Sequence, residues 1–191
     1  TFMKQFDPQL RVDQLAEYRT SVHGRKNAEG DEHVAVCIDC HGVHGIRKPS
    51  SPQSTVYPKN IPSTCGKCHA DPKVMRGHVL DDGKTPIPTN QLEEYTKSVH
   101  GRALFEKNDM GAPVCNDCHS AHTIQRADAS GFRMDIMQKC GRCHGEIAKT
   151  YFDTYHGKVS QLGYSKTAKC YDCHGAHDIQ KISDPRSHLS R

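Results

Sequence analysis

The chain has no tryptophan, and aromatic residues make up only 6% of its 191 residues. Hydrophobic residues reach 35%, and a polypeptide this poor in large apolar side chains builds a thin core. No apolar run is long enough for a transmembrane helix. No long basic run is interleaved with aromatic residues, as nucleic-acid binding would favour. We therefore expect no transmembrane segment and no nucleic-acid partner. We also expect that something other than side chains supplies most of the apolar core.

Unpaired cysteines are also absent. All ten cysteines lie in five strings of the form CxxCH, in which a histidine directly follows the second cysteine. We number these strings sites 1 to 5 in chain order: Cys37/Cys40/His41, Cys65/Cys68/His69, Cys115/Cys118/His119, Cys140/Cys143/His144 and Cys170/Cys173/His174. No cysteine remains for a disulfide.

CxxCH is the attachment signature of c-type haem. Each thiol adds across one vinyl group of the porphyrin, and the adjacent histidine becomes the proximal ligand of the iron. Zinc ribbons also use paired cysteines, but they need no histidine after the second one. Five such histidines therefore favour five covalent haem c groups over zinc, with the ten cysteines as attachment points and the five histidines as iron ligands.

Five porphyrins would supply the missing apolar core. With 191 residues and five sites, about 38 residues are available per haem. We expect one multihaem domain over residues 1–191, mainly irregular with short α-helices, wrapped around a stacked chain of haems, with little or no sheet. The formal net charge of +4 would be offset by roughly ten propionate charges, so many basic residues are expected to serve the propionates.

One pattern occurs three times, in residues 17–46, 94–125 and 151–180. Each copy has a His-Gly pair, then CxDCH, then another histidine three residues further on. A simpler CGxCH string follows the first two copies. The sequence thus predicts unit 1 (13–80) and unit 2 (90–145) with two haems each, and unit 3 (146–182) with one.

The segments before the His-Gly pairs have helical spacing. Asp13 and Asn90 are the predicted N-caps of the first two, and the third is predicted from about Glu146 to His156. The glycine after each histidine stands where a helix commonly stops. We therefore expect these histidines at helix C-termini.

Six further histidines recur at fixed offsets, and we expect them to be distal iron ligands. They are His23, His100 and His156 before the cysteines, and His44, His122 and His177 after CxDCH. Three histidines and four methionines recur at no fixed position and are not expected to bind iron: His33, His78, His188, Met75, Met110, Met134 and Met137. The aspartate of CxDCH either orients the proximal imidazole or caps a helix; these residues are Asp39, Asp117 and Asp172.

The pairing of ligands is a further prediction. We expect His44 to serve site 2 and His122 to serve site 4, each being the next site along the chain, while His177 is free or the least essential of the six. His23, His100 and His156 then serve the CxDCH sites in one of two registers. If each serves its own unit, the chain is monomeric. If each serves the preceding unit, His23 binds the terminal haem of another molecule, and copies associate head to tail.

The SVHG…CxDCHGxH…CGxCH arrangement resembles the multihaem c-type cytochromes of anaerobic and metal-respiring prokaryotes over nearly all of residues 15–180. The resemblance implies a periplasmic or extracellular electron carrier, including the haem-chain filaments that some members form. Its partners would be other redox proteins or copies of itself. Thioether attachment occurs outside the cytoplasmic membrane, so we expect an exported, mature chain from which the signal peptide is absent.

Two functions are compatible with these motifs. The first is electron transfer through five bis-histidine haems, without enzymatic activity. The second is a multihaem reductase of a small nitrogen or sulfur oxyanion, which needs one haem with an open axial position. Such enzymes often carry lysine in place of the proximal histidine, and no CxxCK string occurs. Six distal candidates for five irons favour electron transfer.

Overall fold

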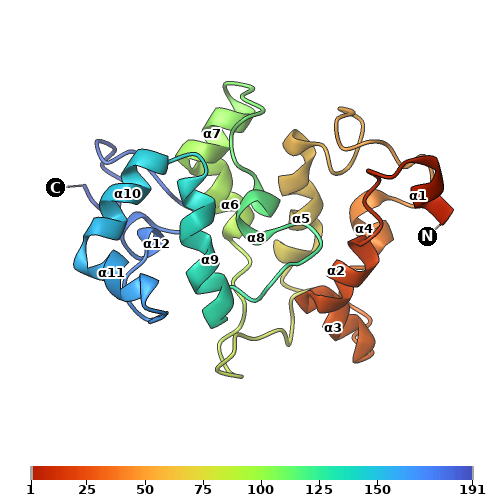
Figure 1. Cartoon of the computed structure of the whole chain (residues 1–191), viewed down its shortest axis with the longest axis horizontal. Helices are drawn as coiled ribbons and strands as arrows, with labels where there is room; N and C mark the ends of the chain where they lie inside the picture. Colours follow the sequence, from red (N-terminus) through yellow and green to blue (C-terminus); the bar gives the residue numbers. More distant parts are fainter. Residues whose placement is uncertain (1, 191) are drawn as a thin grey trace.

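Short helices joined by irregular chain form the protein, whose computed structural model describes residues 2–190 (Figure 1). The helices are α1 (Phe2–Phe6), α2 (Gln14–Thr20), α3 (Val22–Ala28), α4 (Cys37–His41), the 3-10 helix η1 (Pro58–Asn60), α5 (Ile61–His69), α6 (Gln91–Lys97), α7 (Val99–Phe105), α8 (Cys115–His119), α9 (Ser130–Gly141), α10 (Gly145–Asp153), α11 (Tyr155–Gln161) and α12 (Cys170–His174). Extended pairing in residues 2–190 is limited to one isolated bridge between Val79 and Pro86. The expectation of short helices with little or no sheet is confirmed.

The helices follow one another along the longest axis of the molecule (Figure 1). Helices α1 to α4 lie at one end, and α10 to α12 lie at the other, with the two termini at opposite ends. Over residues 2–190, none of the helices combines the length and the apolar character that a membrane crossing requires.

Each predicted helix before a His-Gly pair is in fact two helices with a sharp break between them. The pairs are α2/α3, α6/α7 and α10/α11. At the first break Ser21 is extended, with φ −72° and ψ 164°, and its hydroxyl accepts a hydrogen bond from Gly24 N at 3.0 Å. Ser98 and Thr154 make the equivalent bonds at the other breaks. These side chains are N-caps, so the histidines lie in the first turn of the second helix, and the prediction of a helix C-terminus is wrong.

The glycine of each His-Gly pair permits close packing and does not stop a helix. A Cβ atom on Gly24 would lie 1.9 Å from the carbonyl oxygen of Tyr18 in the preceding helix. Gly101 stands in the same relation to Tyr95. Only glycine lets the second helix fold back this tightly on the first.

A tyrosine in the first helix of each pair ties it to the chain before CxDCH. Tyr18 Oη donates to Ala35 O at 3.0 Å, and Tyr95 Oη donates to Pro113 O at 2.9 Å. In unit 3, Tyr151 Oη donates to Ala168 O at 2.7 Å. The acceptor is always two residues before the first cysteine of the string, so this bond positions the CxDCH helix against its helix pair.

The side-chain core is small and lies around attachment cysteines. One cluster consists of Ile61, Leu104, Ala112 and Val114, with Cys65 and Cys115 packed against it. The second consists of Phe132, Ile136 and Met137, with Cys118, Cys140 and Cys170 packed against it. The thin core expected from composition is present, and Met137 has the packing role predicted for the methionines.

Neighbouring units meet through one repeated backbone bond. Val22 N, at the start of α3, donates to Ile124 O of unit 2 at 2.8 Å. Val99 N, at the start of α7, donates to Ile179 O of unit 3 at the same distance. The isoleucine is in each case two residues after the histidine that follows CxDCH. The chain after CxDCH therefore lies against the preceding unit.

Candidate functional site

Four of the five CxxCH histidines face a second imidazole at almost the same separation of ring centres. The pairs are His41–His122 at 6.1 Å, His69–His23 at 6.1 Å, His119–His177 at 6.1 Å and His144–His100 at 6.2 Å. The interplanar angles range from 19° to 42°. Side-chain packing alone has no reason to hold one distance while the angle varies this much.

The common distance is that of two axial ligands on one metal ion. Metal–imidazole bonds are about 2 Å long and the ring centre lies about 1.1 Å beyond the nitrogen, so trans ligands have ring centres about 6.2 Å apart. Among residues 2–190, no group of three or more His, Cys, Asp or Glu side chains converges as a metal site. The paired histidines are compatible with haem iron, for which a porphyrin would supply the four remaining ligands.

Six of the eight paired histidines have a lowered pKa, which favours their neutral form. Burial, with contributions from His69 and His78, lowers the pKa of His23 to about 4. Burial also lowers the pKa of His119 to about 4, with His177 and Lys139 contributing. The pKa values of His41, His69, His100 and His177 are lowered in the same way, with burial as the main cause. The neutral imidazole is the form that binds iron.

The structure changes the predicted pairing of the histidines after CxDCH. His122 lies opposite His41 of site 1, and not at site 4. His177, expected to be free or the least essential, lies opposite His119 of site 3. The bonds from Val22 to Ile124 and from Val99 to Ile179 hold this stretch against the preceding unit, which is why these histidines face backwards along the chain.

Two of the three histidines of the His-Gly pairs lie opposite the histidines of the CGxCH sites and not of the CxDCH sites. His23 lies opposite His69 of site 2, and His100 lies opposite His144 of site 4. The helix break at Ser21 places His23 in the first turn of α3, with its ring toward α5. The predicted contact between His23 and a neighbouring molecule is therefore wrong, because His23 already has a partner within its own chain.

Two of the six distal candidates face no CxxCH histidine within residues 2–190. His44 is exposed after α4. His156 Nδ1 lies 3.2 Å from Thr167 Oγ1. Over the same residues, His174 of site 5 faces no second imidazole. Within residues 2–190 the chain thus forms four histidine pairs and leaves the fifth site with one histidine.

The three histidines outside the repeated positions have other surroundings. His188 Nε2 lies 2.6 Å from Asp178 Oδ2, and His78 Nδ1 lies 3.8 Å from Asp31 Oδ2. His33 is exposed. Sequence reasoning could not place His78, which is near enough to His23 and His69 to lower the pKa of both.

The aspartate of CxDCH caps its own helix. Asp39 Oδ2 accepts a hydrogen bond from Val36 N at 2.7 Å. Asp117 accepts from Val114 N, and Asp172 from Lys169 N, also at 2.7 Å. Of the two roles left open by the sequence, these bonds favour helix capping, which fixes the start of the helix on which both thiols stand.

The five sites lie side by side in sequence order. Helix α4 contacts α5, α5 contacts α8, and α8 contacts α9, which links sites 1 to 4. The thiols of Cys65 and Cys115 hydrogen-bond, which raises the pKa of Cys65 and lowers that of Cys115. Cys140 and Cys170 are linked in the same way, and the bond lowers the pKa of Cys170 to about 7.

The ten predicted attachment cysteines are all free of disulfides, as expected, but they differ in burial. Seven are partly buried: Cys40, Cys65, Cys68, Cys115, Cys118, Cys140 and Cys170. The other three are exposed: Cys37, Cys143 and Cys173. Cys37 lies in α4 at one end of the molecule, while Cys143 and Cys173 belong to sites 4 and 5 toward the other end.

Cys143 and Cys173 differ in burial from the first cysteine of their own strings. Both side chains are exposed, and neither belongs to a side-chain cluster, whereas Cys140 and Cys170 of the same strings pack on the second cluster. Cys143 lies beyond the last residue of α9, and Cys173 lies in the last helix, α12. Protein side chains therefore enclose only the first thiol of sites 4 and 5. Attachment of haem through the second thiol stays a prediction, and a haem held there would lie at the surface.

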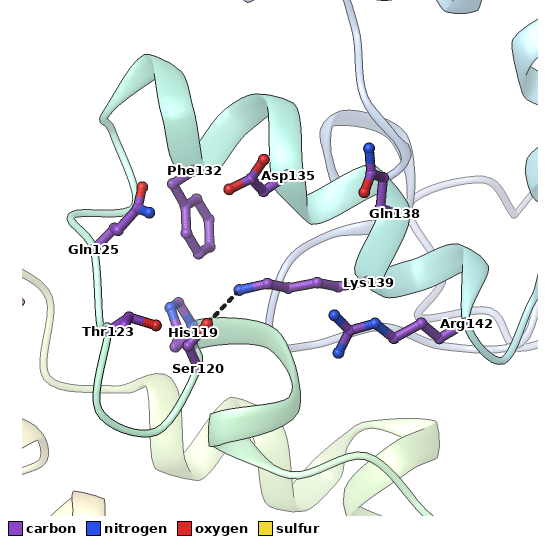
Figure 2. Close-up of a pocket in the computed structure, with 9 residues that line it drawn as sticks. All are labelled: His119, Ser120, Thr123, Gln125, Phe132, Asp135, Gln138, Lys139 and Arg142. Atoms are coloured by element: carbon purple, nitrogen blue, oxygen red, sulfur yellow. Dashed lines mark hydrogen bonds between the residues drawn. The ribbon is translucent and has the colours of Figure 1, made fainter. Parts of the chain in front are cut away.

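A cavity of about 310 Å³ lies beside the proximal histidine of site 3 (Figure 2). Phe132 stacks on His119 with ring centres 5.2 Å apart. Lys139 Nζ, which points at the loop after α8, donates to Cys118 O at 2.7 Å and to Ser120 Oγ at 2.9 Å (Figure 2). With Arg142 also in its lining, the cavity suits an apolar group that carries carboxylates, such as the edge of a haem.

Comparison with known proteins adds no assignment. No protein-family model, curated protein or solved structure matches the chain. The functional argument therefore depends on the motifs and the geometry of this chain.

Proposed function

We propose that the protein transfers electrons through five covalently attached c-type haems. The observation that carries this proposal is the common separation of 6.1–6.2 Å in four histidine pairs, each containing the histidine of a CxxCH string. Haem iron with two imidazole ligands exchanges one electron at a time and offers no open position to a substrate. Four of the sites would be closed in this way by the chain's own residues.

The order of the sites supports the same function. The attachment cysteines of successive sites lie close enough to influence one another from site 1 to site 5. The capped helices position the thiols of sites 1, 3 and 5, and the four histidine pairs would hold the haems of sites 1 to 4. Groups held rigidly and close together exchange electrons with little rearrangement of the surrounding protein. Two histidine ligands also imply lower potentials than histidine–methionine ligation gives.

The cell compartment and the partners follow from the proposed cofactor. Because the thioether bonds of haem c form outside the cytoplasmic membrane, we place the protein in the periplasm or outside the cell. Its partners would be other redox proteins or further copies of the chain.

Haem content and ligation test the proposal together. The intact mass of the purified protein is expected to exceed that of the polypeptide by five haems, and low-temperature EPR is expected to show at least four low-spin ferric centres. His33→Ala, which changes an exposed histidine outside the pairs, is the control and is expected to keep both results. Bound zinc without haem would refute the proposal.

One observation favours the second function. Site 5 has a single histidine within the described chain, and the Asp178–His188 pair close to Gly175 offers a proton-transfer group. A reductase of a small nitrogen or sulfur oxyanion would use such an open position. Turnover of nitrite, hydroxylamine or sulfite with a reduced dye, lost in His188→Ala, would establish this function. Absence of turnover in protein that carries five haems favours electron transfer alone.

A further inference from the structure

The join between unit 1 and unit 2 consists of three contacts. Val22 N donates to Ile124 O at 2.8 Å. His122 faces His41 at 6.1 Å. A nitrogen of the same ring, His122 Nδ1, lies 3.6 Å from Glu17 Oε2. One short stretch of unit 2 thus contributes a backbone acceptor and an imidazole ring to unit 1. A carboxylate of unit 1 lies beside the Nδ1 atom of that ring.

The join between unit 2 and unit 3 repeats all three contacts. Val99 N donates to Ile179 O at 2.8 Å. His177 faces His119 at 6.1 Å, and His177 Nδ1 lies 3.9 Å from Glu94 Oε2. In both joins, one face of a unit contacts the stretch that follows CxDCH in the next unit. We call this face the receiving face. The two surfaces are therefore a matched pair that this molecule uses twice.

Each end of the described chain carries one half of this join. At the unit 1 end, His44 and Ile46 stand where His122 and Ile124 stand in unit 2, and Ile46 is 62% exposed. At the unit 3 end, Tyr155 stands in the position of Val22 and is 77% exposed. His174 of site 5 has no second imidazole within residues 2–190.

Exposed apolar surface is concentrated at the same two ends. In residues 2–190, every large hydrophobic side chain that is strongly exposed lies in residues 2–46 or 147–189, and none lies between. At the unit 1 end they include Ile38, Val43 and Ile46. At the unit 3 end they include Tyr155 and Leu162. Apolar surface gathered in this way marks an interaction site, and the receiving face and the stretch that it fits are both present on this one chain.

We propose that copies of the chain associate head to tail, with residues 43–46 of one copy docked on the unit 3 end of the next. His44 then lies opposite His174 as the second ligand of site 5, and Ile46 O accepts from Tyr155 N. The proposal rests on the proposed haem ligation. Because the two ends lie at opposite ends of the longest axis (Figure 1), the contact is open and extends in a line instead of closing into a dimer.

One difference sets the expected strength of this contact. Thr150 stands where Glu17 and Glu94 stand in the first two units. The Nδ1 atom of His44 would therefore have no carboxylate at the equivalent position. The contact between copies also lacks the covalent link that holds neighbouring units together. We therefore expect association to be reversible by dilution, with one of five irons becoming high-spin as the copies separate.

The test uses the purified haem-loaded chain in sedimentation velocity, with EPR on the same samples. Wild-type protein is expected to form a ladder of oligomers that shortens on dilution. His44→Ala is expected to sediment as a monomer with about one high-spin centre in five. The control, His33→Ala, is expected to behave as wild type. A wild type that stays monomeric at every concentration, or assemblies that persist in His44→Ala, would overturn the proposal.

A mixing experiment keeps the test independent of any one variant. Tyr155→Asp places a charge on the receiving face and is also expected to be monomeric. His44→Ala retains a receiving face, and Tyr155→Asp retains His44, so a mixture is expected to form dimers and nothing longer. No dimer in the mixture would count against the assigned surfaces. Five haems per chain in every sample would leave the proposed function standing even if association fails.

Discussion

Units 2 and 3 contain the same helix pair, the same tyrosine tie and the same capped CxDCH helix, yet they differ in completeness. Site 3 in unit 2 receives His177 from its neighbour, and Leu104 of the same unit is fully buried. Site 5 in unit 3 has no second imidazole within residues 2–190, and Leu162 is 87% exposed. The local motif forms each CxDCH site, but at sites 1 and 3 the second imidazole comes from the following unit. A CxxCH string therefore predicts haem attachment, but it does not predict which residue would be the second ligand of the iron.

The largest expected effect separates the two units by stability. Under the proposed haem attachment, Cys115→Ala/Cys118→Ala and Cys170→Ala/Cys173→Ala would each remove one haem. The unit 2 variant is expected to lose more stability, and more than the about 2–5 kcal/mol of a large-to-small core substitution. Both of its cysteines pack on side-chain clusters, whereas in unit 3 only Cys170 does and Cys173 is exposed. Thermal unfolding followed by circular dichroism measures the difference. Equal losses in the two variants would show that haem burial is not concentrated at the centre.

Ligand removal is expected to affect one histidine of unit 3 and not the other. His177→Ala takes away the ring opposite His119, so about one iron in five is expected to become high-spin. His156→Ala is the matched control, because His156 faces Thr167 and no CxxCH histidine. EPR of the two variants gives the comparison. A high-spin centre in His156→Ala alone would contradict the observed pairing.

A pair of leucines compares the centre with the end directly. Leu104→Ala is expected to cost about 2–5 kcal/mol, since its side chain is fully buried. Leu162→Ala is expected to change the free energy of unfolding by less than about 0.5 kcal/mol, because Leu162 is mostly exposed. Chemical denaturation of dilute protein measures both values. The ordering would be refuted if Leu162→Ala proved the more costly change.

The smallest effect is expected at the tyrosine ties. Tyr95→Phe and Tyr151→Phe each remove one hydrogen bond, to Pro113 O and Ala168 O, at a cost of about 0.5–1.5 kcal/mol. Tyr95 packs against the cluster around Leu104 and Tyr151 against the cluster around Phe132, so similar losses are expected at the two positions. Tyr164→Phe, at an exposed side chain, is the control and is expected to be neutral. Denaturation midpoints of the three variants provide the check.

The sequence predicts what is local in this protein. Short helices and helix starts after Asp13 and Asn90 follow from spacing and composition, and the structure contains them. The role of Gly24 was wrongly predicted because glycine is favoured both after a helix and where two backbones approach closely. The serine two residues before His23 was the available signal for a new helix, since serine is a common N-cap.

The burial of the attachment cysteines could not be predicted from the motif. Every CxxCH string has the same spacing, yet Cys143 and Cys173 are exposed while Cys118, in the same position of site 3, packs on the second cluster. The difference comes from the neighbours of each helix in space. A string of five residues contains no information about those neighbours.

The pairing of histidines is not local either, and spacing predicted it wrongly. His122 follows site 3 directly, yet its partner His41 is 81 residues earlier in the chain. What decides this is the bond from Val22 to Ile124, a contact between units that no pattern within one unit reveals. Repetition does contain a signal: the histidine after CxDCH recurs together with an isoleucine two residues later, and both belong to the join.

Because the two joins use the same contacts, the molecule has a modular boundary. A gene duplication that inserted one more unit at a join would create a segment whose two faces already match its neighbours. Such a protein could grow in length without evolving a new interface, and each added unit would enter at the same angle and register as the last. The bond from Val22 to Ile124, seen again from Val99 to Ile179, thereby gives this small protein a ready route to longer descendants.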